Sequence, residues 1–256
     1  MNRSLPDLIA FDFDGVICDG LVEYFQTSWR AYCQLFQPAD STPPDGLAER
    51  FYRLRPVIET GWEMPVLLQA LLAGETDEAI IAGWPELAHP YLEKANLTPQ
   101  QTVKAVDGMR DEWITTDLEG WLGLHRFYPD MLQVLESAMS LIPSTYIVST
   151  KEGRFIRQLL QQNGVEMAPD RIIGKESKQP KYETLRQLMA KHQTVSVWFI
   201  EDRLKALNAV KQQADLAGVK LFLADWGYNL APERETAQQD TRIDLLSLGQ
   251  LVQKFE

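Results

Sequence analysis

Two aspartates, Asp12 and Asp14, follow directly on the apolar run 8–11 and precede Gly15. A short apolar run that ends at a glycine turn is typical of a buried strand. Residues two apart in a strand share a face, so the two carboxylates would lie close together and repel each other when ionised. A bound Mg²⁺ or a shared proton would relieve that repulsion. The pair therefore fits a magnesium site with a carboxylate nucleophile beside a carboxyl acid/base, or only an Asp-Gly turn at a strand end.

Further polar residues end later strand-like runs. Ser149, with Thr150 as the alternative, ends one run, and the acidic pair Glu201 and Asp202 ends another. A serine hydroxyl can donate to a phosphate oxygen, but a serine in this place is also a common helix N-cap. Adjacent acids after a buried strand suit Mg²⁺, which prefers oxygen ligands, although an isolated Glu-Asp pair is common in surface turns. In a parallel sheet the carboxyl ends of the strands are where ligands bind.

The order of the predicted elements indicates an α/β protein with a helical insertion. Residues 20–125 carry apolar side chains at helical spacing, with a good helix start at Thr98-Pro99. From Pro129 onward, helical patterns alternate with strand-like runs, which implies a right-handed, mostly parallel sheet. The strands are expected at 7–13, 145–148, 171–174, 195–200 and 219–224. Residues 225–227, after the last of these runs, are expected to form a turn at the same edge of the sheet.

Composition narrows the class of protein. The chain has 256 residues and a net charge of −11, which argues against a nucleic-acid or anionic-membrane partner. No apolar stretch approaches the roughly 20 residues of a membrane span. Two cysteines, Cys18 and Cys33, are too few for a disulfide framework, and the N-terminus lacks the pattern of a signal peptide. We therefore expect a cytoplasmic protein, a monomer or homodimer, with a small-molecule substrate.

The segment 12–19 reads D-F-D-G-V-I-C-D. It resembles motif I of the haloacid dehalogenase-like (HAD) hydrolases, D-x-D-G-[TV]-[LI]-x-D, at every defined position. Ser149, a lysine near residue 180 and the pair Glu201-Asp202 resemble motifs II, III and IV in the family's order. The resemblance implies a Rossmann-like, mostly parallel three-layer sandwich, the HAD core, formed by 1–19 and 126–256. It also implies that 20–125 are the inserted all-helical C1 cap of subfamily I, which closes over the site and excludes water.

The resemblance also implies a role for each residue. Asp12 would be the nucleophile that forms an aspartyl-phosphate, and Asp14 the general acid/base. Asp12, Asp202 and the backbone carbonyl of Asp14 would hold Mg²⁺, with Glu201 binding directly or through water. Ser149 would donate to a phosphate oxygen, aided by the helix that starts near 153. An acid at position 14 favours phosphoryl transfer over dehalogenation, because a halide leaves without a proton.

Motif III is a lysine that neutralises the phosphate and the nucleophile. Lys181 fits the form K-x-x-x-L and is preferred, Lys178 fits the K-P-x-P spacing, and Lys175 is a third candidate. The chain departs from the family at one point: many members carry a further acid at the positions of Ala206 or Leu207. The sequence leaves open whether Glu201 replaces that acid, and metal affinity depends on this replacement.

The function implied by these motifs is that of a Mg²⁺-dependent phosphohydrolase acting on a small phosphorylated metabolite. A phosphomutase uses the same core and remains an alternative, as does a non-catalytic HAD-like binding or regulatory protein. The missing acid after Asp202 favours the non-catalytic alternative, whereas the intact pair of Asp12 and Asp14 argues against it.

Overall fold

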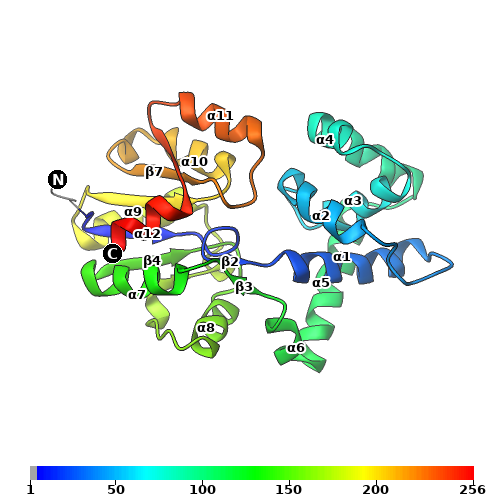
Figure 1. Cartoon of the computed structure of the whole chain (residues 1–256), viewed down its shortest axis with the longest axis horizontal. Coiled ribbons are helices and arrows are strands. Elements are labelled where there is room, and N and C mark those ends of the chain that lie inside the picture. The colour runs from blue at the N-terminus through cyan, green and yellow to red at the C-terminus, as the bar shows by residue number, and fades with distance from the viewer. Residues whose placement is uncertain (1–4) are drawn as a thin grey trace. The chain divides into compact units, whose positions relative to one another are not determined.

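The structure, a computed structural model, describes residues 5–256. Contacts between residues divide the chain into two compact units. One consists of the segment that ends at Asp19 together with Arg126–Glu256, and the other of Gly20–His125. Among the described residues, the first unit contains every strand, and the second unit has helices without strands (Figure 1).

The first unit is built on a six-stranded sheet in the order β5-β4-β1-β6-β7-β8. Every neighbouring pair of strands is parallel, which confirms the predicted parallel α/β arrangement. β1 lies at the centre, and Leu8 is opposite Ser144 on one side and Val197 on the other. A strand with both faces covered must be apolar throughout, which is why β1 and β6 are continuous buried runs. The strands are β1 (Leu8–Phe11), β4 (Ser144–Val148), β5 (Ile172–Ile173), β6 (Val197–Glu201), β7 (Lys220–Ala224) and β8 (Ile243–Leu246).

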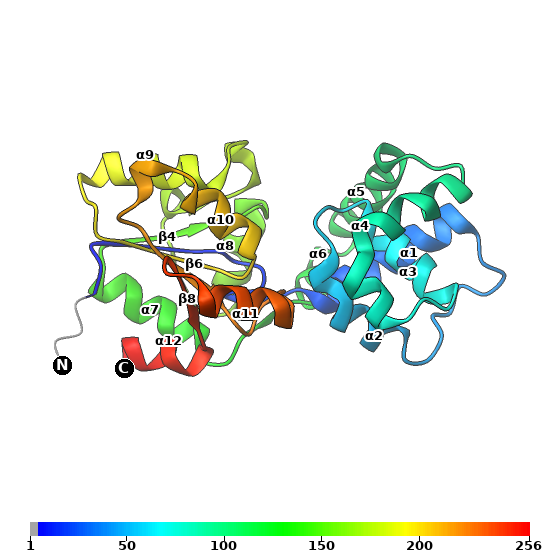
Figure 2. The same ribbon diagram turned by 90° about the horizontal axis from the view of Figure 1, so that it is seen from above.

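Helices cover both faces of this sheet, so the unit has three layers (Figure 2). α9 and α10 pack on one face, where their leucines join a core with alternate residues of β1, β4, β6 and β7. α7 and α12 pack together on the opposite face. The helices of this unit are α7 (Met131–Leu141), α8 (Gly153–Gln162), α9 (Lys181–His192), α10 (Leu204–Lys211), α11 (Ala231–Gln239) and α12 (Leu248–Phe255), with short 3₁₀ turns η2 (Pro169–Arg171), η3 (Lys175–Ser177) and η4 (Ala214–Leu216).

A short ribbon forms where the chain leaves and re-enters this unit. β2 (Cys18–Asp19) pairs antiparallel with β3 (Arg126–Phe127), so that Asp19 is opposite Arg126. Each strand has only two residues, too few for alternation of polar and apolar residues to reveal it in the sequence. The ribbon brings together two segments that are separated in the sequence by the whole helical unit.

The second unit is all-helical, as predicted for 20–125. Its centre is α3, in which nearly every side chain is buried against α1, α2, α4 and α5. The predicted helix start at Thr98 is present. The Thr98 hydroxyl accepts the N–H of Gln101, and the Gln101 side chain accepts the N–H of Thr98, so Thr98 is the N-cap of the helix. The elements are α1 (Leu21–Phe36), α2 (Leu47–Leu54), η1 (Arg55–Val57), α3 (Glu63–Leu72), α4 (Asp77–Lys94), α5 (Pro99–Thr116) and α6 (Leu118–Leu122).

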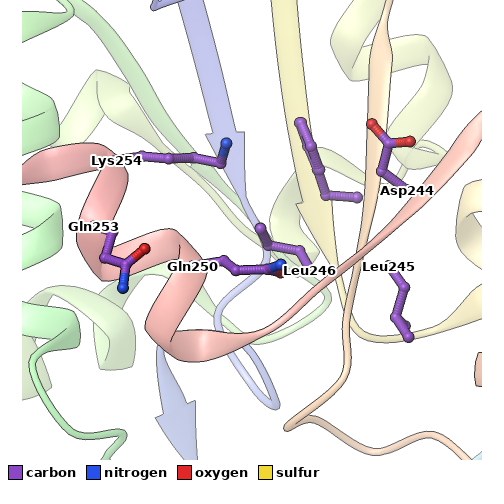
Figure 3. A pocket seen from close by; sticks show the side chains of 7 residues that line it. Asp244, Leu245, Leu246, Gln250, Gln253 and Lys254 are labelled. Carbon is purple, nitrogen blue, oxygen red and sulfur yellow. The ribbon is translucent and has the colours of Figure 1, made fainter. Parts of the chain in front are cut away.

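A pocket of about 410 Å³ lies against β7, β8 and α12. It is lined by Phe222, Asp244, Leu245, Leu246, Gln250, Gln253 and Lys254 (Figure 3). None of the residues assigned a chemical role from the sequence lines this pocket. Among the described residues, no helix has the length and hydropathy needed to cross a membrane.

Candidate active site

Parallel strands bring the predicted site residues to one edge of the sheet. Asp12 follows β1, and Ser149 follows β4 on one side of it. On the other side, Glu201 ends β6 and Asp202 follows it. The backbone N–H of Asp12 donates to Ile200 O at 2.8 Å, so Asp12 continues the pairing of β1 with β6. The sheet therefore places acids from two distant segments next to each other.

Three carboxylates gather at this edge. Oxygen atoms of Asp12, Glu201 and Asp202 lie within 4.8 Å of one another. All three side chains are buried, with 6%, 0% and 1% of their residue surfaces exposed. Among residues 5–256, this is the group of acids close enough together to hold a metal ion. The carboxylate of Asp14 is not one of its members.

One lysine reaches this cluster. Lys181 is the first residue of α9, and its Nζ lies 2.8 Å from Asp12 Oδ2 and 2.6 Å from Glu201 Oε2. Its ammonium offsets one of the three negative charges. Burying the two negative charges that remain, with no cation to balance them, would be strongly unfavourable, because the interior solvates ions far less well than water does.

Burial and the excess of negative charge both act on the pKa values of the cluster. Burial, followed by the charge of Glu201, raises the pKa of Asp12 to about 7 despite the opposing effect of Lys181. Burial and the charge of Asp12 raise the pKa of Asp202 to about 6, and burial also raises that of Glu201. A hard divalent cation with oxygen ligands would supply the missing positive charge, so this donor set fits Mg²⁺.

Gly15 and Gly227 enclose Asp202. Gly15 has a φ of +83°, and a Cβ there would lie 2.0 Å from Asp202 Oδ2. A Cβ on Gly227 would lie 2.3 Å from Asp202 Cβ and 2.4 Å from the Gly15 carbonyl oxygen. The glycine of the D-x-D-G pattern is thus required by backbone conformation and by space.

Comparison with known proteins identifies the fold. None of the known family models matches the chain, and none of the curated proteins does. Solved structures do match over nearly the whole length. A haloacid dehalogenase-like hydrolase from Streptococcus pneumoniae is 15% identical with a TM-score of 0.61, covering 97% of this chain and 95% of its own. A predicted phosphatase from Clostridium acetobutylicum is 16% identical with a TM-score of 0.58, covering 98% of both chains.

A predicted phosphoglycolate phosphatase from Haemophilus somnus also matches, at 16% identity and a TM-score of 0.57, covering 90% of this chain and 88% of its own. The chain has the HAD-like fold. The likeness confirms the Rossmann-like α/β class that the sequence predicts.

Within the HAD-like fold, the structure separates the lysines of the predicted motif III. Lys181 contacts Asp12 and Glu201, whereas Lys178 is an exposed residue in a left-handed conformation, φ 52°, after η3. Lys175 is exposed as well. The geometry therefore agrees with the preferred spacing K-x-x-x-L and brings neither alternative lysine into the cluster.

The segment after β4 agrees in part with the sequence prediction. Ser149 is buried and accepts the N–H of Lys151 at 3.3 Å, whereas Thr150 is exposed. The helix α8 begins at Gly153 as expected, but the Gly153 N–H donates to Glu176 Oε2 at 3.1 Å. This amide, which we expected to assist phosphate binding, therefore already binds a carboxylate.

Two contacts at the site were not foreseen. Lys151 Nζ lies 3.3 Å from Asp14 Oδ1, and both side chains are mostly buried. The backbone N–H of Tyr228 donates to Asp202 Oδ2 at 2.7 Å. The position of Lys151, two residues beyond Ser149, is a signal that could have identified it. The contact of Tyr228 carries no such local signal, because its partner is 26 residues away.

Thermal stability in EDTA should fall as the pH rises, whereas the added stabilisation by Mg²⁺ should grow. Because the folded-state pKa values of Asp12 and Asp202 are about 7 and about 6, above the ordinary 3.8, the folded state binds protons more tightly than the unfolded state. In EDTA, this contribution should make the protein least stable above pH 7 and progressively more stable as the pH falls toward 4. Mg²⁺ binds the ionised acids, so it should stabilise most above pH 7.

Differential scanning fluorimetry over this pH range, in EDTA and in Mg²⁺, measures both effects. Asp202→Asn removes one titrating acid and one ligand, so it should reduce both responses. Asp244→Asn, an exposed acid on β8, is the control and should change neither. A melting temperature that is the same in EDTA and in Mg²⁺ above pH 7 would contradict the assignment of the cluster as a metal site.

Proposed function

We propose that this protein is a Mg²⁺-dependent phosphohydrolase of small phosphorylated metabolites that works through an aspartyl-phosphate. The observation that carries the proposal is the buried cluster of Asp12, Glu201 and Asp202 with Lys181 in contact with Asp12. The HAD-like fold supports it, as do two matched structures that are described as predicted phosphatases. We assign the role of a cap to the helical unit Gly20–His125 from its position in the chain, between β2 and β3.

In the first step, a carboxylate oxygen of Asp12 attacks phosphorus and the bond from phosphorus to the leaving oxygen breaks. Asp14 gives its proton to that oxygen, which leaves as an alcohol. Asp14, now ionised, takes a proton from water, and the water oxygen attacks the phosphorus of the aspartyl-phosphate. The bond from phosphorus to Asp12 then breaks, which releases phosphate and restores both aspartates. When bound, Mg²⁺ supplies positive charge that lets an anionic phosphoryl group approach Asp12.

The surrounding groups prepare Asp12 and Asp14 for these steps. The Phe13 N–H donates to Asp12 Oδ1 at 2.7 Å and Lys181 contacts Oδ2, so both oxygens of the nucleophile are held in place. Lys181 can also offset charge on the phosphoryl group in the transition state. Lys151 contacts Asp14 Oδ1 and keeps the second carboxyl in a defined position.

Release of phosphate from p-nitrophenyl phosphate should depend on Mg²⁺ and stop in EDTA. A panel of phosphoglycolate, sugar phosphates and nucleotides then gives the substrate class from kcat/KM. Asp202→Ala should raise the Mg²⁺ concentration needed for half-maximal activity, with partial rescue at high Mg²⁺, because the site loses one of few protein ligands.

Other outcomes distinguish the alternatives. Transfer of the phosphoryl group to a second position of a sugar phosphate, without net phosphate release, would identify a phosphomutase. Absence of phosphate release from the whole panel, together with measurable binding of a panel member, would favour a non-catalytic binding protein.

A further inference from the structure

The loop that follows β7 reaches the metal-binding acid Asp202 through Tyr228. The backbone N–H of Tyr228 donates to Asp202 Oδ2 at 2.7 Å. The hydroxyl of the same residue donates to Asp19 Oδ1 at 2.8 Å, in the strand β2. One residue therefore connects Asp202 with β2 of the β2–β3 ribbon.

Further hydrogen bonds hold the backbone of this loop. Asn229 Nδ2 donates to Asp202 O at 3.0 Å and to Ala224 O at 2.8 Å. Arg203 donates to the carbonyl oxygen of Tyr228 at 2.7 Å. Trp226 Nε1 donates to Val16 O at 3.0 Å. The loop is thus attached to both segments that carry the acids, the one after β1 and the one after β6.

The space around Asp202 leaves it little freedom to adjust if the loop moves. Gly15 and Gly227 approach Asp202 so closely that neither could carry a Cβ without a clash. Tyr228 is itself buried, with 5% of its surface exposed, and the bond from its hydroxyl to Asp19 is partly buried. A displacement of the Tyr228 backbone would therefore be transmitted to the Asp202 carboxylate.

We propose that Tyr228 is a positioning residue for the metal site: its hydroxyl, anchored on Asp19, holds its backbone N–H against Asp202 and so orients that carboxylate toward the bound cation. The inference rests on the proposed function only in requiring that the cluster of Asp12, Glu201 and Asp202 binds a divalent ion. Groups that orient a metal ligand without touching the metal typically change metal affinity 10- to 100-fold when they are removed.

Binding of Mn²⁺, measured by electron paramagnetic resonance of the free ion and by calorimetry, tests the proposal without any turnover. Tyr228→Phe removes one hydroxyl and should weaken Mn²⁺ binding about tenfold or more. Tyr146→Phe is the control, because this buried tyrosine on β4 also loses the bonds of its hydroxyl, to His192 Nε2 at 2.7 Å and from Lys191 Nζ at 3.3 Å. Its Mn²⁺ affinity should equal that of the wild type.

Two substitutions of Asp19 separate the hydrogen bond from the charge. Asp19→Asn keeps an oxygen that can accept from Tyr228 and should bind Mn²⁺ nearly as the wild type does. Asp19→Ala removes the acceptor and should weaken binding as Tyr228→Phe does. Both changes break the same hydrogen bond, between Tyr228 and Asp19. The double variant of Asp19→Ala and Tyr228→Phe should therefore bind Mn²⁺ no more weakly than either single variant.

The outcomes distinguish this inference from the proposed function. A wild-type protein that binds no Mn²⁺ would overturn both. A wild-type protein that binds Mn²⁺, with Tyr228→Phe binding equally well, would overturn only the role of Tyr228. Equal losses in Asp19→Asn and Asp19→Ala would also overturn it, since charge alone would then explain the effect. Should Tyr228→Phe fail to fold, the comparison of the two Asp19 variants decides.

Discussion

Asp12→Asn should abolish Mg²⁺-dependent phosphate release while leaving the protein folded. An amide is a poor nucleophile, so no aspartyl-phosphate can form, and loss of a covalent nucleophile reduces kcat by at least about 10³-fold. The fold should tolerate the change, because asparagine has nearly the same shape and its oxygen can still accept the Phe13 N–H. Loss of the Asp12 charge breaks the ion pair with Lys181 but also removes repulsion with Glu201.

Activity at saturating Mg²⁺ and thermal melting of the same samples test this expectation. Asp244→Asn, the same chemical change on an exposed residue of β8, should keep full activity. Retention of more than a few per cent of wild-type activity by Asp12→Asn would show that another group is the nucleophile.

Lys181→Ala should reduce kcat far more than Lys178→Ala. Removal of one preorganised charge contact typically costs about 3–4 kcal/mol, or about 10²–10³ in rate. Lys181 contacts Asp12, which follows β1, and Glu201, which ends β6, whereas Lys178 is exposed after η3. Lys178→Ala should therefore remain close to wild type in kcat.

The kinetic comparison needs a variant that separates charge from packing. Lys181→Met keeps most of the side-chain volume and removes the charge, so it should lose as much activity as Lys181→Ala. A Lys181→Met enzyme with nearly normal kcat, or a larger loss in Lys178→Ala than in Lys181→Ala, would contradict the role given to Lys181.

The strand-end positions of the acids could be predicted because they depend on a simple rule. Parallel strands place their carboxyl ends at one edge, so recognising apolar runs before Asp12, Ser149 and Glu201 was enough to bring these residues together. The preference for Lys181 over Lys178 depended on spacing alone. The structure supplies the physical reason, because α9 begins at Lys181 and Lys178 lies in a left-handed turn before it.

The contacts that the sequence does not predict depend on how the loop after β7 folds back onto the ends of other strands. Residues 225–227 were expected to be a turn at this edge, yet nothing local indicates that Gly227 packs on Asp202 or that Tyr228 bonds to Asp19. Within α4 the backbone of Gly83 is non-helical, so two helical stretches meet there at a kink. Pro85 lacks the N–H that would bond to the preceding turn, and glycine readily adopts the non-helical conformation there.

The central position of β1 has a consequence for how the chain folds while it is being synthesised. Ile9 pairs with Thr145 and Trp198, so the pairing of β1 is completed only after Trp198 has left the ribosome. The helices of Gly20–His125 form a continuous segment whose contacts are largely its own, so that segment can fold first. Until β4 and β6 emerge, Leu8–Phe11 remains an apolar strand with two open edges. Slow translation or early termination between these strands therefore favours aggregation of the nascent chain over its folding.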